Sequence, residues 1–412
     1  MLADEEVLAM PEMTLPDLEA VVTLNPCQTP PPIPVVTTGA PVRERQLLYL
    51  SAREYLYAIN AVDGTARWCQ EAQLLRTREP VYHPMMSYPP PPRLTFGAPR
   101  VVAGVTGAND EAGAVYVAMD GFGTYTCAFA AEDGAFRWWS QTDGRVSSMP
   151  FLDYAAPLVD DDRIYSGTYA LGARDGSVLW RTDIDTRTEG ALALHAISDE
   201  TLYATTQRGA YAINAQDGHV RWLYQPDTHS MLREAPVVAD RLLFVGTESV
   251  VCALDAATGA EVWRAPLPLG SYRGAVIQHE TLYVNAGPAL CALDTKSGSL
   301  RWRHQFPAVA SSPPTLDRDV LYVNITADGA YALSSRDGAV LWRHPLEISS
   351  GTSRNVGPVG TFASSVVLED AVYVARLGIR ARGVLFALDA RTGAECWHTA
   401  YPFGGALLAM RQ

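Results

Sequence analysis

Short runs of alternating apolar and polar residues cover most of the chain, a pattern typical of half-buried strands. Residues 253–263, ALDAATGAEVW, hold one such run, a turn around Thr258 and Gly259, and a second run ending in a large aromatic residue. An alanine, a glycine six residues later and a tryptophan four residues after that recur eight times. The tryptophans are separated by 70, 42, 42, 41, 39, 40 and 55 residues, so six copies follow one period of about 40. The eight tryptophans are Trp68, Trp138, Trp180, Trp222, Trp263, Trp302, Trp342 and Trp397.

Each repeat predicts a set of short antiparallel strands. The glycine follows Asp, Thr or Ser in every copy, and such pairs reverse the chain because glycine adopts positive φ without a Cβ clash. The alanine leaves a gap between bulky neighbours that a large ring from an adjacent repeat can fill, and we expect the tryptophan to fill it. Another alternating run precedes each copy, such as LYVNA at 282, and several copies start with a small residue and proline, such as Ala235 and Pro236.

These observations predict an all-β fold, an eight-bladed β-propeller of four-stranded antiparallel blades that stack on their neighbours to bury both faces. Residues 35–412 are expected to form this single domain, with each blade ending near its tryptophan. Residues 1–34 are acidic and then proline-rich, and we expect an irregular or short-helical leader.

The spacing Ala-x-Asp-x-x-Thr-Gly-x-x-x-Trp resembles the tryptophan-docking motif of the pyrroloquinoline quinone (PQQ) repeat propellers, the quinoprotein alcohol dehydrogenase-like family. Residues 253–263 and 387–397 match it at every defined position, 292–302 carries Ser297 for threonine, and the other five copies have an Asp-Gly turn. The resemblance covers residues 40–400. It implies eight blades, with each tryptophan docked between adjacent blades.

Charge and hydropathy limit the classes of partner and the location. The chain has 32 basic and 45 acidic side chains, a net charge of −13, which argues against binding to nucleic acid or to an anionic membrane. No apolar run approaches the length of about 20 residues that a membrane-spanning helix needs. The first residues lack the basic and apolar regions of a secretory signal, so the chain as written is expected to be cytoplasmic. An exported or membrane-anchored protein is the alternative if the chain is a mature or excised fragment.

The six cysteines show no spacing typical of a metal site or a disulfide framework. Cys127, Cys252 and Cys291 occupy the same strand position in three repeats, and Cys69 and Cys396 flank docking tryptophans. We therefore expect free, reduced thiols.

Two long insertions and one lengthened hairpin interrupt the regular repeat. They span residues 76–93, 348–362 and 376–383. In a four-stranded blade, the link to the next blade and the middle hairpin emerge on the same face, so all three are expected on one face near blades 7, 8, 1 and 2. Arginine, aromatic and methionine side chains are enriched at interface centres, which suggests a binding surface. Its candidate residues are Tyr82, His83, Met85, Met86, Tyr88, Arg354, Arg376, Arg380 and Arg382.

No motif points to catalysis, and no catalytic or metal-binding residue is assigned. The resemblance makes a PQQ-dependent dehydrogenase the alternative, but those enzymes carry an adjacent cysteine pair under the cofactor, a calcium shell and a carboxylate base, and this chain has no Cys-Cys pair. Asp183, Asp185 and Glu189 resemble a calcium loop only in part, because the glycine and the third loop ligand are missing. The preferred prediction is a monomeric, non-enzymatic scaffold without cofactor, similar to the outer-membrane assembly lipoprotein type of propeller, that holds a protein or peptide on one face. A small-ligand enzyme using the axial funnel remains the alternative.

Overall fold

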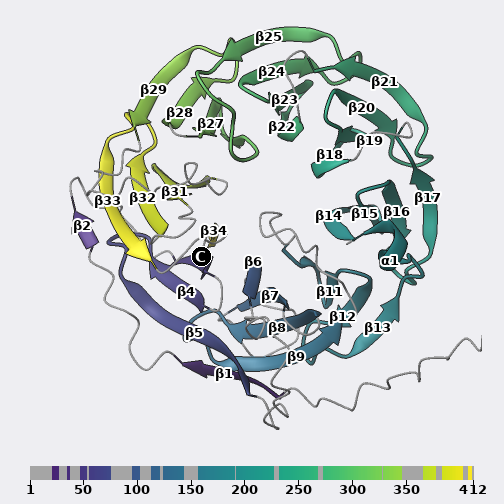
Figure 1. The fold of residues 1–412 in the computed structure, drawn as a ribbon, viewed down its shortest axis with the longest axis vertical. Helices are drawn as coiled ribbons and strands as arrows, with labels where there is room; N and C mark the ends of the chain where they lie inside the picture. The colour runs from purple at the N-terminus through teal and green to yellow at the C-terminus, as the bar shows by residue number, and fades with distance from the viewer. Residues whose placement is uncertain are drawn as a thin grey trace, which may run out of the picture.

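The described strands form eight sheets arranged in a ring around a central axis (Figure 1). The computed structural model of the protein describes residues 21–26, 35–37, 47–52, 55–75, 95–102, 113–120, 124–142, 156–190, 192–226, 232–267, 272–326, 328–345, 365–376, 383–401 and 407–410. The predicted eight-bladed propeller of four-stranded antiparallel blades is confirmed. The one described helix, α1 (Thr186–Glu189), has four residues, and no helix in the described part of the chain could cross a membrane.

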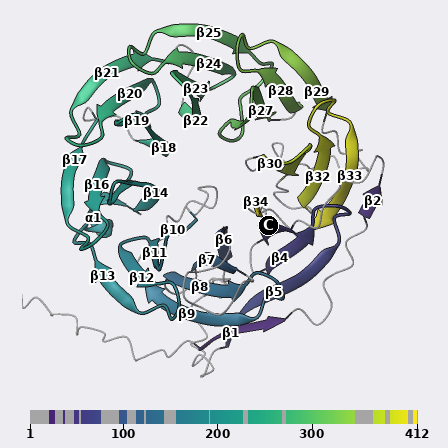
Figure 2. The ribbon, with the colours of Figure 1, turned by 180° about the vertical axis from the view of Figure 1, so that it is seen from behind.

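Blades 2 to 7 each consist of four consecutive strands, ordered from the axis outward. Blade 2 contains β6 (Thr95–Val102), β7 (Ala114–Asp120), β8 (Thr124–Ala130) and β9 (Phe136–Thr142). Blade 3 contains β10 (Leu158–Asp160), β11 (Arg163–Ser166), β12 (Tyr169–Gly172) and β13 (Val178–Arg181). Blade 4 contains β14 (Ala193–Ser198), β15 (Thr201–Thr205), β16 (Ala210–Asn214) and β17 (Val220–Tyr224). Blade 5 contains β18 (Arg233–Ala239), β19 (Leu242–Gly246), β20 (Val250–Asp255) and β21 (Glu261–Pro266). Blade 6 contains β22 (Tyr272–Gln278), β23 (Thr281–Ala286), β24 (Ala289–Asp294) and β25 (Leu300–Gln305). Blade 7 contains β26 (Thr315–Asp317), β27 (Val320–Ile325), β28 (Gly329–Ser334) and β29 (Val340–Pro345). In the view from behind, the innermost strands β6, β10, β14, β18, β22 and β30 lie around the axis (Figure 2).

Blades 1 and 8 have five strands because both ends of the chain join them. Blade 1 contains β34 (Leu407–Met410), β3 (Leu47–Ala52), β4 (Tyr55–Asn60), β5 (Ala66–Leu75) and β1 (Val21–Pro26), from the axis outward. Blade 8 contains β30 (Val366–Leu368), β31 (Ala371–Arg376), β32 (Gly383–Asp389), β33 (Glu395–Tyr401) and β2 (Val35–Thr37). The C-terminal strand β34 thus supplies the innermost strand of blade 1 and joins the end of the chain to the first blade.

The leader differs from the expectation of an irregular or short-helical segment. Residues 21–26 within it form β1, which pairs antiparallel with β5 from Val21 opposite Leu75 to Pro26 opposite Gln70. An open outer edge of a sheet presents unpaired backbone groups, and β1 satisfies those of β5. Residues 40–42 carry the same small residue and proline that start other repeats, which predicts the first strand of blade 1 at that place. They lie outside the described residues, and β34 occupies the innermost position of that blade.

Each docking tryptophan contacts the next blade around the ring. In every case the indole Nε1 donates a hydrogen bond to the backbone carbonyl three residues before the next blade's turn glycine. The donor–acceptor distances lie between 2.8 and 3.1 Å. The acceptors, from Trp68 to Trp397, are Ala131, Ala173, Ala215, Ala256, Thr295, Ser335, Ala390 and Ala61.

The glycine of the next blade makes room for each ring. A Cβ added to any of the eight turn glycines would lie only 2.5 to 2.8 Å from the docked indole. The repeat alanine lies directly opposite the tryptophan of its own blade, as Ala212 does opposite Trp222. The ring of Trp222 lies on Gly259 of blade 5, while Gly218 of its own blade receives Trp180. The recurring glycine therefore both reverses the chain and forms the seat of the neighbouring ring.

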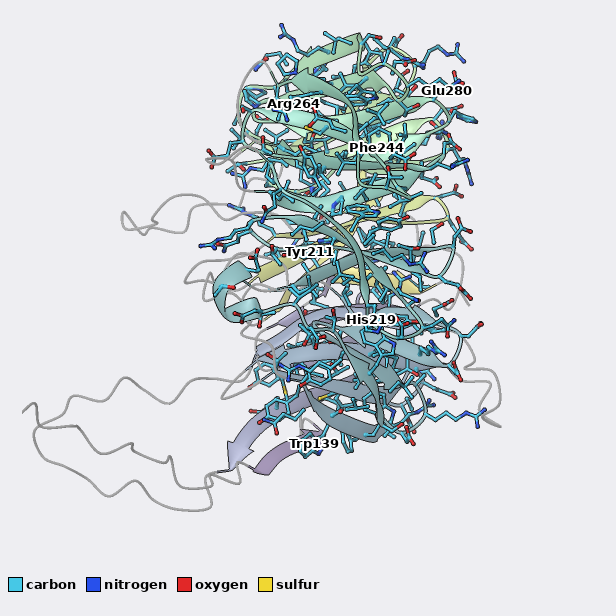
Figure 3. The ribbon with its side chains drawn as sticks, turned by 90° about the vertical axis from the view of Figure 1, so that its right-hand side faces the viewer. Trp139, Tyr211, His219, Phe244, Arg264 and Glu280 are labelled. Carbon is cyan, nitrogen blue, oxygen red and sulfur yellow. The ribbon has the colours of Figure 1, made fainter. Side chains whose placement is uncertain are left out.

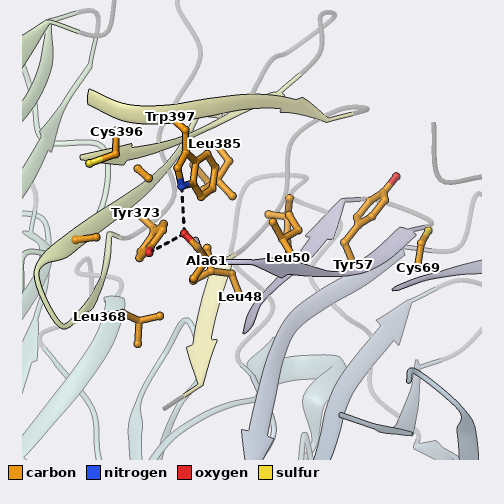
Figure 4. Close-up of a cluster of buried hydrophobic side chains, with 14 residues drawn as sticks. Leu48, Leu50, Tyr57, Ala61, Cys69, Leu368, Tyr373, Leu385, Cys396 and Trp397 are labelled. Atoms are coloured by element: carbon orange, nitrogen blue, oxygen red, sulfur yellow. Dashed lines mark hydrogen bonds between the residues drawn. The ribbon is translucent and has the colours of Figure 1, made fainter. Parts of the chain in front are cut away.

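The ring closes between blades 8 and 1 by the same contact. Trp397, of which 1% is exposed, donates to the Ala61 carbonyl at 3.1 Å, and the Tyr373 hydroxyl donates to the same oxygen at 3.1 Å. Both side chains lie in a buried cluster with Leu48 and Leu385 (Figure 4). A tyrosine hydroxyl joins the indole on the docking carbonyl at five other junctions as well.

Blade 3 has a shortened middle hairpin, which the sequence predicts because Trp180 follows Tyr165 by 15 residues whereas Trp222 follows Tyr203 by 19 in blade 4. Its second and third strands end at Ser166 and begin at Tyr169, so only Gly167 and Thr168 connect them. Gly167 has a φ of 56°, in the left-handed region that such a tight reversal requires.

The cysteines divide into two groups. Cys127, Cys252, Cys291 and Cys396 are buried and form no disulfide, which agrees with the expected free thiols. Cys69 is disulfide-bonded, so the prediction of a free thiol is wrong at this position. The repeat spacing gave no sign of this because it describes only the regular strands, whereas β5 is paired with the additional strand β1.

Candidate functional site

The strand order gives the disc two different faces. Antiparallel strands in chain order place the blade-to-blade links and the middle hairpins on one face, here called the loop face. The remaining turns, including all eight Asp-Gly-type turns, lie on the other face, here called the turn face. In the edge-on view of Figure 3, α1, which links blades 3 and 4, lies on one side and Glu280, in a turn of blade 6, on the other.

The three lengthened segments are anchored on the loop face. The first connects Leu75 to Thr95, the second connects Pro345 to Val366, and the third connects Arg376 to Gly383. The first segment joins blades 1 and 2, the second joins blades 7 and 8, and the third lies within blade 8. Blades 7, 8, 1 and 2 are consecutive around the ring because the Trp397 contact joins blade 8 to blade 1. Most of the residues predicted to bind a partner lie outside the described residues: Tyr82, His83, Met85, Met86, Tyr88, Arg354, Arg380 and Arg382.

Arg376 is the one predicted binding residue that the structure describes. It is the last residue of β31, pairs in register with Val384 of β32, and is partly buried. Burial lowers the pKa of its guanidinium below the ordinary value, although arginine stays charged at neutral pH. Arg376 therefore places a positive charge at the base of the lengthened hairpin, on the loop face.

Polar side chains near the loop face join neighbouring blades close to the axis. Asn285 Nδ2 donates to the Ser312 carbonyl at 2.8 Å, and Asn324 Nδ2 donates to Ser365 Oγ at 3.0 Å. These asparagines occupy the same position in the second strands of blades 6 and 7. Both are buried, and their hydrogen bonds hold the following blade's first segment in place.

His195 is a further polar residue of this inner region, and sequence reasoning did not single it out. It is the extra residue of a bulge in β14, where Leu194 pairs with Ala204 and Ala196 with Tyr203. Its Nε2 lies 2.8 Å from Thr205 Oγ1. Burial lowers the pKa of His195 to about 4, so the ring is neutral at physiological pH. No signal in the sequence marks it, because the bulge is set by pairing with β15.

Asp185, one of the three residues that partly resemble a calcium loop, has a structural role. The Asp185 carbonyl accepts hydrogen bonds from the backbone N–H groups of Thr188 and Glu189, and its Oδ2 accepts one from Thr188 Oγ1 at 3.2 Å. Asp185 thus caps the N-terminus of α1, which follows it directly. Across the described ranges, no group of three His, Cys, Asp or Glu side chains could hold a metal ion.

The acidic residues of the turn face stabilise their own turns. Asp255 Oδ1 accepts hydrogen bonds from the backbone N–H and the hydroxyl of Thr258, both at 2.9 Å. These hydrogen bonds lower the pKa of Asp255 because they favour the charged carboxylate. The same pattern recurs at Asp389 with Thr392. Such carboxylates have partners within the turn and are poor candidates for catalysis.

Comparison with known proteins places the chain in a family. The family model described as "Outer membrane protein assembly factor BamB" matches residues 166–249 and 247–406, which is more than half of the 412 residues. The chain belongs to the BamB family. No curated protein matches it by sequence.

Solved structures share the propeller of this BamB-family chain at low sequence identity. BamB from Moraxella catarrhalis has a TM-score of 0.54 and 13% identity, with 93% of this chain and 98% of that chain covered. AztD from Citrobacter koseri has a TM-score of 0.56 and 12% identity over 89% and 98% of the two chains. The quinohemoprotein alcohol dehydrogenase ADHIIG from Pseudomonas putida HK5 has a TM-score of 0.50 and 13% identity over 92% and 76%. Since both binding proteins and enzymes can share one fold, these likenesses describe the fold alone.

Proposed function

We propose that this BamB-family chain is a non-enzymatic scaffold that binds a protein or peptide on its loop face. The observation that carries the proposal is the common anchoring of all three lengthened segments on that face, at the consecutive blades 7, 8, 1 and 2. Loops held by a rigid framework are where recognition usually resides. The name of the family model, an assembly factor, agrees with a role in holding other proteins.

The proposed partner presents an acidic segment. Arg354, Arg376, Arg380 and Arg382 concentrate positive charge in two of the lengthened segments of a protein with a net charge of −13. Long-range attraction of this kind raises the association rate more than it changes the contacts in the bound state. The association rate should therefore fall as salt is added.

The test compares two loop-face variants with a charge-matched control on the turn face. One variant replaces residues 82–92 by a Gly-Ser linker, and another changes Arg376, Arg380 and Arg382 to Glu. The control changes Arg241, Arg318 and Arg336 to Glu, since these arginines lie in turns of the opposite face. Proteins captured by the wild type are identified, and their association rates are measured with each purified variant.

Reduced association for both loop-face variants and unchanged association for the control would support the proposal. If both folded loop-face variants retain every partner at the wild-type rate, the loop face is not the binding site.

The alternative function is a PQQ-dependent dehydrogenase or another small-ligand enzyme in the axial funnel, and it rests only on analogy with a quinohemoprotein alcohol dehydrogenase of the same fold. The absence of an adjacent cysteine pair from the sequence argues against the PQQ enzyme. Incubation with PQQ and calcium discriminates between the two: a bound-quinone absorption band together with reduction of an electron-accepting dye would favour the enzyme.

A further inference from the structure

The disulfide at Cys69 has one candidate partner within the chain. The sequence contains six cysteines. Four of them, Cys127, Cys252, Cys291 and Cys396, are buried and free. Cys69 is disulfide-bonded, so the remaining cysteine, Cys27, is left as its partner. Cys27 itself lies outside the described residues.

The register of the outermost strands of blade 1 points to the same residue. Strand β1 ends at Pro26, which pairs with Gln70 of β5. In an antiparallel pair, each step forward on one strand is a step back on the other, so extending this register by one residue would put Cys27 opposite Cys69. Directly opposite residues of antiparallel strands have Cα atoms about 4.5 to 5.5 Å apart, within the range of about 4.4 to 6.8 Å that a disulfide bridges.

We propose that Cys27 and Cys69 form an intramolecular disulfide that fastens the N-terminal strand β1 to the outer edge of blade 1. The bond encloses a loop of the chain that contains β2, and β2 pairs with β33 of blade 8. The loop therefore runs from blade 1 to blade 8 and back to blade 1 through β3 and β4. Figure 1 shows β1 and β2 on the outside of these two adjacent blades. The disulfide thus closes a covalent strap around the junction where the ring closes.

Formation of the bond is an oxidation. The two thiols lose two protons and two electrons and form one S–S bond, and the disulfide of a thiol–disulfide oxidoreductase accepts the electrons and protons and becomes a dithiol. Such bonds persist in oxidising compartments and are rare in the cytosol. The proposal therefore places folding of this chain in an oxidising compartment and favours the exported alternative over the cytoplasmic expectation.

Peptide mapping tests the bond directly. Trypsin should cut after Arg43, Arg67 and Arg76, which puts Cys27 in the peptide that ends at Arg43 and Cys69 in the peptide 68–76, with no other cysteine of this sequence in either. Protein taken from the source cell, with its thiols blocked by an alkylating agent at lysis, should yield the two peptides as one linked species that separates on reduction. Recovery of both peptides alkylated without reduction, or linkage of Cys69 to another cysteine or to a second chain, would overturn the proposal.

Serine variants test what the bond does. Cys27→Ser, Cys69→Ser and the double variant should each lower the Tm by about 5 °C, and the double variant should lose no more than either single variant. A reducing agent should lower the Tm of the wild type to that of the double variant and leave the double variant unchanged. Cys396→Ser is the matched control, because Cys396 also flanks a docking tryptophan but forms no disulfide. A reducing agent should lower the Tm of this variant by the same amount as it lowers the Tm of the wild type. If the linked peptide is found but the serine variants have the same Tm as the wild type, the bond does not stabilise the junction and the proposed strap is overturned.

Discussion

Replacement of Trp222 by alanine measures the value of one docked indole. Its Nε1 donates to the Ala256 carbonyl at 3.0 Å, and its ring lies where a Cβ on Gly259 would be 2.7 Å away. Trp222 is partly buried, so its loss should lie toward the lower end of the about 3–5 kcal/mol that deleting a buried tryptophan costs, of which the hydrogen bond contributes about 1 kcal/mol. The Tyr203 hydroxyl donates to the same Ala256 carbonyl at 3.3 Å, and we expect it to keep this hydrogen bond in the variant. Since that oxygen keeps a partner, we expect a loss of about 3–4 kcal/mol.

Trp139 provides the matched control, because it follows the docking residue Trp138 in the same strand but is 46% exposed. Its ring contacts Tyr125 edge-on, with centroids 5.5 Å apart, and Trp139→Ala should cost less than about 1 kcal/mol. Urea unfolding followed by far-ultraviolet circular dichroism gives both free energies without relying on tryptophan fluorescence. Equal losses for the two variants, or a loss below about 1 kcal/mol for Trp222→Ala, would refute the docking geometry.

Two further predictions concern the backbone and the pH dependence. Gly259→Ala should cost at least about 2 kcal/mol more than Gly167→Ala in the same urea assay, because both residues have positive φ but only the Gly259 Cβ would meet a ring. His195 has a folded pKa of about 4, below the ordinary 6.5, so its contribution to stability is present above pH 6.5 and is lost as the pH falls toward 4. The wild type should therefore lose about 2 kcal/mol more than His195→Gln between pH 7 and pH 5; parallel losses in urea unfolding at the two pH values would contradict this.

The eight-bladed ring could be predicted from the sequence, because every blade contains the same short-range pattern of alanine, glycine and tryptophan. The spacing of alanine, glycine and tryptophan identifies the hairpin and its docked ring, and eight copies predict eight blades. The shortened hairpin of blade 3 follows from the same count, since fewer residues separate Tyr165 from Trp180 than separate the corresponding residues of blade 4.

The additions to blades 1 and 8 were not predictable in the same way. Strands β1 and β2 pair with β5 and β33, and neither belongs to a repeat. Strand β34, which pairs with β3, is the exception, because the sequence of residues 404–411 itself indicates one more strand at the junction of blades 8 and 1. The partners of β1 and β2 are defined by ring closure, which brings the two ends of the chain together, and not by local spacing. The disulfide at Cys69 was missed for this reason. The proposed binding face stays a prediction, since most of its residues lie outside the described part of the chain.

The use of backbone carbonyls as docking acceptors has a consequence for how this protein tolerates mutation. Every docking indole donates to a main-chain oxygen, and the residues that supply those oxygens are alanine at six positions, threonine at one and serine at one. A side-chain substitution cannot delete a main-chain acceptor, so the docking hydrogen bond does not depend on the chemistry of the acceptor's side chain. The size of that side chain is still limited, because seven of the eight acceptor residues are buried. The tryptophan is therefore the one partner of each junction whose chemistry is required, whereas the acceptor residue and the glycine beneath the ring are limited in size.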